Sequence, residues 1–147
     1  MAELTRQEVI KIVAIGRRPI RLQGVDLSGL DLSYLDLSWV NLVDANLSGC
    51  NLSHAVLNNS FLFCANLEGA DLHDAQISNA DLICSNLAGA DLRKAYLRQT
   101  ALLGACLVGA NLTEARIAEV SLDGVEVDET TIWPEGFVLE QHVLHSR

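Results

Sequence analysis

Few side chains in this sequence have the types and spacing that chemistry needs. His54 and Asp74 are twenty residues apart. In the repeat described below they should lie in neighbouring coils, where an imidazole and a carboxylate can exchange a proton. No nucleophile or orienting third group accompanies them. Carboxylates such as Asp71 and Asp91 recur with the repeat itself, which favours a solvated surface. The sequence therefore predicts no catalytic residue and no enzyme.

The four cysteines, Cys50, Cys64, Cys84 and Cys106, do not form a metal-binding pattern, because they include no CxxC pair and no histidine stands at ligand spacing. Cys50 is expected in the core. Cys64 and Cys84 should stack one coil apart, near enough for a disulfide, but no secretion signal is present and reduced thiols are expected. A redox role for this pair is the alternative. Phosphate-loop motifs are also absent, so we expect no metal and no cofactor.

The elements that position these residues follow a five-residue repeat. Every fifth residue from Leu22 to Ile132 is Leu, Ile or Val, and a second, mostly small residue stands two positions before each. In an α-helix five residues turn through about 500°, so the leucines would scatter around the axis. In a strand an odd step alternates the two faces. The chain must therefore bend once per repeat and stack as a solenoid.

Exceptions to the pattern indicate how many repeats close one coil. Glycine recurs every twenty residues, at Gly29, Gly49, Gly69, Gly89 and Gly109. Twenty residues is four repeats, so we predict a square cross-section with about five and a half coils, spaced by about 4.8 Å. The glycines suit type II turns, and an asparagine series at the same spacing, Asn46, Asn66 and Asn86, predicts a hydrogen-bond ladder.

We name the four sides by their first central residues: side A begins at Leu22, side B at Leu27, side C at Leu32 and side D at Leu37. Each side recurs every twenty residues. The glycine and asparagine series both belong to side B, whereas His54 and Asp74 belong to side C.

Units such as Ala-Asn-Leu-Ser-Gly (45–49) and Ala-Asp-Leu-His-Asp (70–74) resemble the A(D/N)LXX motif of the pentapeptide-repeat family, over about three quarters of the chain. The resemblance implies an all-β fold, a right-handed quadrilateral parallel β-helix. It places the central residue and the preceding small residue inside, and the other three outside. It implies little about function, because family members differ widely in what they do.

One domain with three parts is expected. An N-terminal capping helix occupies residues 1–19, and the solenoid spans 20–132. The helix itself is expected over residues 4–16, where Thr5 followed by Glu8 is a capping-box signature before an apolar run. Such a helix would cover the open first coil. A partner-binding or membrane-surface helix is the alternative.

The third part, residues 133–147, is the C-terminal cap and tail. Trp133 and Phe137 are large apolar residues placed to close the last coil. For the remaining tail, with Val143 and Leu144, three alternatives stay open: it covers the last coil, lies along side A, or meets another chain. The last alternative makes a homodimer one of the expected assemblies.

The charge and the hydropathy of the chain limit the kinds of partner it can bind. The net charge is −9, and the acidic residues concentrate in the solenoid. Direct nucleic-acid binding is disfavoured, because neutralising phosphates requires a basic track. No stretch approaches the roughly 18 apolar residues that span a membrane. We therefore expect a cytoplasmic protein that binds neither nucleic acid nor membrane.

Side A departs from the repeat in its outward residues. After the central residue it places Val43, Phe63, Ile83 and Leu103 in successive coils, and Phe61 lies on the same side. If outward, these residues form an exposed apolar stripe about 15 Å long. Such patches usually mark interfaces. The alternative is that the tail or incidental packing covers them.

These observations favour a non-catalytic scaffold or adaptor that binds a protein partner or itself, through side A. A second hypothesis comes from the resemblance alone: some pentapeptide-repeat proteins are acidic rods that imitate duplex DNA and bind DNA gyrase, conferring quinolone resistance. This chain shares the acidic character but is short, and its repeats contain no inserted loop.

Overall fold

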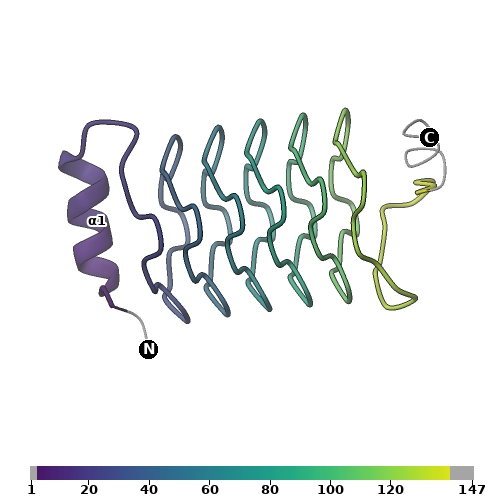
Figure 1. Cartoon of the computed structure of the whole chain (residues 1–147), viewed down its shortest axis with the longest axis horizontal. Helices are drawn as coiled ribbons and strands as arrows, with labels where there is room; N and C mark the ends of the chain where they lie inside the picture. Colours follow the sequence, from purple (N-terminus) through teal and green to yellow (C-terminus); the bar gives the residue numbers. More distant parts are fainter. Residues whose placement is uncertain (1–2, 140–147) are drawn as a thin grey trace.

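The computed structural model describes residues 3–139 of the chain. One helix, α1 (Arg6–Ile15), lies at one end of the molecule, and coils follow it in a single row along the long axis (Figure 1). The chain therefore runs from a helical cap through a stack of coils that grows in one direction.

Parallel bridges join each coil to the next. They link residues twenty apart, from Arg21 with Asn41 to Cys106 with Glu126, and only the final bridge, Asn111 with Ile132, spans twenty-one. Each bridge is isolated, so every side of a coil contributes one short extended segment before the chain turns again. The spacing confirms the prediction of four five-residue repeats per coil.

The core consists of two sets of inward side chains. Central residues from Leu27 to Leu112 are almost wholly buried, and from Val40 onward the residues two positions earlier are buried beside them. Cys50 takes one of these small positions and is buried, as predicted. Where the small residue is polar, its hydroxyl is satisfied inside: Ser60 donates to the carbonyl of Leu57 at 2.6 Å. Small residues at this position let the chain pass close to the central leucines at each corner.

The chain turns at the second residue after each central residue. This residue has a positive φ on all four sides, for example +64° at Gly49, +57° at His54 and +59° at Asn59. On side B the backbone N–H of Cys50 closes the turn on the carbonyl of Leu47 at 3.1 Å. A positive φ at the third turn residue is what a type II turn requires. The turns predicted for the glycines of side B therefore occur on every side, mostly at residues other than glycine.

Asp or Asn usually stands directly before each central residue, and the hydrogen bonds of its side chain explain this preference. Its side-chain oxygen accepts the backbone N–H two positions later, as Asn46 does from Ser48 at 3.1 Å and Asn86 from Ala88 at 3.0 Å. The asparagine amides also donate to the preceding coil: Asn46 to Asp26 at 3.2 Å and Asn86 to Asn66 at 3.3 Å. The predicted ladder on side B is confirmed. The same side chains also fix each turn, which the sequence reasoning missed.

Carboxylates that accept a backbone N–H two positions later, as Asp36 and Asp128 do, have a lowered pKa. The pKa of Asp36 lies below the ordinary 3.8, chiefly because the hydroxyl and N–H of Ser38 donate to it and secondarily because Arg18 is close. The pKa of Asp128 is lowered in the same way by Thr130. A carboxylate with a lowered folded-state pKa stabilises the fold fully above the ordinary value, and this contribution is lost as the pH falls through the folded-state pKa.

Replacing Asp36 and Asp128 together by Asn should therefore reduce the acid sensitivity of the fold. Asparagine keeps the acceptor oxygen, as native Asn46 does, but has no proton to take up. We expect wild type to lose stability as the pH is lowered from 5 to about 3, and the double variant to lose less. Urea midpoints measured across this range test it. Parallel curves for the two proteins would contradict this explanation.

Helix α1 forms and ends as its sequence predicts. Thr5 caps it, with its hydroxyl accepting the N–H of Glu8 at 3.3 Å while the Glu8 carboxylate accepts the N–H of Thr5 at 2.7 Å. Val9 is fully buried against the core, and Ile12 and Val13 pack beside it. The helix spans ten residues of the predicted 4–16. It covers the first coil as expected.

Arginine side chains complete this cap by binding backbone carbonyls that have no earlier coil to accept from. Arg6 of α1 donates to the carbonyl of Asp31 and, at 3.2 Å, to that of Ser33. Arg18 does the same on the next side, to Ser38 and, at 3.1 Å, to Asp36. Each guanidinium thus satisfies two carbonyls of the exposed coil edge, a position that otherwise invites strand addition.

The last coil corrects one sequence prediction. Ile132 was expected as a central, inward residue, but it is 49% exposed and bridges to Asn111, twenty-one residues earlier. One additional residue in the preceding turn shifts the register. Thr131 is buried instead and donates its hydroxyl to a carbonyl of the previous coil at 2.9 Å. Trp133 then follows at the place of the central residue.

Aromatic residues lie over this end of the core. The rings of Trp133 and Phe137 stack with centroids 4.7 Å apart, and both pack against the buried cluster together with Leu139. The two aromatic residues thus cover the last coil as predicted. The tail residues Val143 and Leu144 lie outside the described residues. Within residues 3–139 no helix is both long and apolar enough to cross a membrane.

Candidate functional site

Side A carries its apolar residues on the outside. Phe63 and Leu103 are 41% and 44% exposed, Phe61 is also exposed, and Val43 and Ile83 are half-buried. We call these five residues the apolar stripe. Val43, Phe63, Ile83 and Leu103 come from successive coils at equivalent positions, so the solenoid aligns them in one row, and Phe61 lies beside Phe63 in the same coil. Their outward placement is as predicted, and their role in binding stays a prediction.

The backbone carbonyls of the stripe already accept hydrogen bonds. The carbonyl of Val43 accepts from Gly24 at 2.9 Å, and that of Phe63 accepts from Asp44 at 3.0 Å. The carbonyl of Ile83 is bonded likewise to the preceding coil. These carbonyls are therefore not available to a molecule lying on side A, which would mainly contact side chains. Such a contact depends on apolar surface and shape.

Two cysteines lie at the edge of the stripe. Cys64 and Cys84 are exposed free thiols one coil apart, as expected from their spacing. The pKa of Cys64 is raised, first by local desolvation and then by the neighbouring thiol and carboxylates, and this keeps it protonated. The pKa of the buried Cys50 is raised to about 11, mainly by desolvation. Neither environment activates a thiolate nucleophile.

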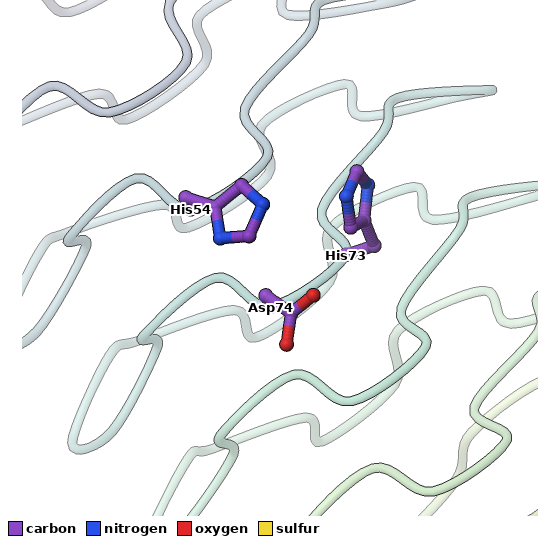
Figure 2. A group of neighbouring side chains, drawn as sticks. All are labelled: His54, His73 and Asp74. Atoms are coloured by element: carbon purple, nitrogen blue, oxygen red, sulfur yellow. The ribbon is translucent and has the colours of Figure 1, made fainter.

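Side C holds His54 and Asp74, the pair that the sequence analysis considered for proton transfer. His54 and Asp74 lie in neighbouring coils as expected, and His73, the residue before Asp74, joins them from the same coil as Asp74 (Figure 2). One ligand-capable atom from each of the three lies within 4.8 Å of the others. Sequence reasoning paired residues at a separation of twenty and overlooked the diagonal neighbour at nineteen. A histidine next to Asp74 was the signal that could have found it.

Each imidazole in the cluster is held by a further contact. The Nδ1 of His73 lies 2.7 Å from Oδ1 of Asp71, and the ring of His54 stacks on Tyr34 with centroids 4.7 Å apart and an interplanar angle of 11°. The two imidazoles meet edge to face, with centroids 5.0 Å apart. The rings are therefore oriented by neighbours on side C.

A hollow of about 450 Å³ adjoins the cluster on the C-terminal side. It contains both signs of charge, because acidic and basic residues alternate along the turn positions. Arg93 is engaged with Asp91 through bonds of 2.6 to 3.0 Å. The lining residues are His73, Asp74, Arg93, Lys94, Thr113 and Glu114.

Comparison with known proteins agrees with this architecture. The family profile for pentapeptide repeats (8 copies) matches residues 20–59, 62–99 and 95–131. The chain therefore belongs to the pentapeptide-repeat family. A search of curated proteins found no match.

Solved structures give the same result for the fold. The pentapeptide repeat protein Rfr23 from the cyanobacterium Cyanothece 51142 is 30% identical, with a TM-score of 0.79, over 84% of this chain and 96% of that one. A pentapeptide repeat protein from the Arabidopsis thaliana thylakoid lumen is 21% identical, with a TM-score of 0.57, over 82% and 91%. The latter likeness shows the fold alone.

Proposed function

We propose that this protein is a non-catalytic scaffold, a right-handed four-sided solenoid that binds another protein chain through the apolar stripe of side A. The observation that carries the proposal is the set of outward apolar side chains on side A, one in each of four successive coils, with Phe61 beside Phe63. Exposed apolar rows bordered by polar residues are typical of interaction surfaces. The regular backbone holds this row rigid, which lowers the entropic cost of binding.

The borders of the stripe support a protein partner. Gln23 and Asp123 hold the equivalent turn positions in the first and last coils, so the row is bounded by polar residues at both ends. The central unit, residues 60–64, contains no charged side chain. A partner would place apolar side chains against this centre and polar groups at the borders, as protein interfaces commonly do.

The size of the stripe limits how much of an interface it can supply by itself. Four coils span about 15 Å. A standard interface buries about 800 Å² on each partner, which is more than one such row supplies. A stable partner must therefore also cover adjoining sides. A second copy of the chain is one such partner, and a different protein with an apolar segment is the other.

Replacing Phe63 and Ile83 together by Glu should abolish this binding while leaving the solenoid folded, because both side chains point outward. We expect at least a tenfold loss of capture of whichever protein wild type binds, or loss of the dimer if wild type is dimeric. Quantitative affinity capture and light scattering after size-exclusion chromatography measure the two cases. Urea unfolding verifies that the variant is folded.

The matched control places the same added charge at the same turn position on other sides, as Ala88→Glu with Ala118→Glu. This control should retain capture and oligomeric state. If the side A variant also retained both, side A would not be the contact surface.

The gyrase-binding alternative has less support from the arrangement of charge. Four basic residues gather on sides C and D in the later coils, and two of them form ion pairs. They interrupt any continuous acidic track there, whereas a mimic of duplex DNA needs a regular series of negative charges. These residues are Arg93, Lys94, Arg98 and Arg116.

A further inference from the structure

We infer that side C contains a binding site for a divalent transition-metal ion such as Zn²⁺, with His54, His73 and Asp74 as its three protein ligands. Two imidazoles and a carboxylate are a donor set that Zn²⁺ and its neighbours in the first transition row accept, with water in the remaining position. The sequence analysis expected no metal, because it looked for ligands close together in the chain.

Geometry is the first argument. The three ligand-capable atoms lie within 4.8 Å of one another. Figure 2 shows the two imidazoles on either side of a gap, with the Asp74 carboxylate below and between them. A tetrahedral site with bonds of about 2.0–2.1 Å holds its ligand atoms about 3.4 Å apart. All three side chains are half-buried and face solvent, so small side-chain rotations close the remaining distance.

The hydrogen bond between His73 and Asp71 is the second, independent argument. A carboxylate only accepts, so in the neutral imidazole the proton lies on Nδ1 and points to Asp71 at 2.7 Å. This leaves the lone pair of Nε2 available for a metal. Metal-binding histidines usually have such a carboxylate behind them, which fixes the tautomer and raises the basicity of the ring. Asp71 is thus a positioning residue for His73.

The stacking of His54 on Tyr34 supplies a similar constraint on the second imidazole. The parallel rings hold His54 against the preceding coil, with its edge available toward His73. Two of the three ligands are therefore oriented before an ion arrives. Such preorganisation reduces the entropy lost on binding.

The charges nearby permit a cation. Arg93 is the guanidinium that lines the hollow, and its charge is paired with the carboxylate of Asp91. Lys94 stands one coil beyond Asp74 in the same column, followed by Glu114. The carboxylates of Asp71 and Asp74 outweigh this one ammonium beside the site.

A second grouping competes for His73. Asp71, His73 and Asp91 also lie within 4.8 Å of one another, with a single nitrogen donor. All three of these residues are already bonded, Asp91 to Arg93 and His73 to Asp71. Binding an ion there would break both contacts. We therefore assign the site to the group with two imidazoles.

Isothermal titration calorimetry of the full chain, with Zn²⁺ as the only ligand added, tests the assignment. Other zinc-binding side chains are removed first, as Cys64→Ser, Cys84→Ser, His142→Gln and His145→Gln together, and this background should still bind one ion. Adding His54→Asn or His73→Gln should weaken binding at least tenfold. Asparagine suits the positive φ of residue 54, so this variant should remain folded.

Two further variants separate ligation from a structural effect. Asp71→Asn keeps the acceptor for the turn, as native Asn51 does, and should weaken binding by about 10- to 100-fold without changing the metal-free urea midpoint. Asp91→Asn should leave the affinity within about threefold. The assignment is overturned if the background binds no Zn²⁺ at millimolar concentration, if His54→Asn binds as tightly as the background, or if Asp91→Asn has the largest effect.

Discussion

Unfolding of a Leu67→Ala variant should require about 3–5 kcal/mol less free energy than unfolding of the wild type. Leu67 is 1% exposed and lies between Leu47 and Leu87, the central residues of the neighbouring coils on the same side. Bridges on both sides fix the spacing of these coils, so they cannot collapse into the space that the missing atoms leave. The effect should therefore fall in the upper part of the range for such substitutions.

Equilibrium unfolding in urea measures this effect, as a lower midpoint at similar slope. The control is Glu68→Ala at the next residue, which is exposed and should change stability by no more than about 0.5 kcal/mol. A loss below about 1 kcal/mol for Leu67→Ala would mean that the central column is not packed as described.

A Val9→Asp variant should lose the N-terminal cap. Val9 is fully buried between α1 and the first coil, so an aspartate there must either bury a carboxylate without a partner or detach the helix. Either outcome costs roughly 3 kcal/mol or more. Detachment would also expose the apolar interior and the edge that Arg6 and Arg18 now satisfy. We therefore expect lower stability together with self-association that rises with concentration.

Urea unfolding and sedimentation velocity at several concentrations measure the two parts of this result. Gln7→Asp introduces the same charge on the exposed face of α1 and should behave as wild type. A monomeric Val9→Asp protein of unchanged stability would show that α1 contributes nothing to covering the first coil.

The fold was readable from the sequence because one simple pattern determines it. A five-residue period with Leu at the centre leaves only a chain that bends once per repeat, and the glycine series gave the number of sides. The helix was predictable because Thr5 and Glu8 form a local signal. These features depend on residues near one another or on strict periodicity.

The features that were missed depend on local geometry, which the five-residue repeat of the sequence does not reveal. The register shift before Ile132 follows from one additional residue in a turn, although the apolar residue at the expected position continued the pattern. His73 was overlooked because contacts between coils include diagonal neighbours. The role of Asp or Asn before each central residue appeared only once their bonds to the following N–H groups were visible.

Every bridge except the last joins residues twenty apart, and this spacing has a consequence for how such a chain can change in length. Insertion of a whole coil would lengthen the rod and leave each surface intact. Loss of a single five-residue unit would preserve the buried pattern equally well, yet rotate everything beyond it by a quarter-turn. Phe63 and Ile83 would then face different directions if the loss fell between them. Insertion or loss of single five-residue units thus preserves the buried core but changes which outward side chains lie on the same side.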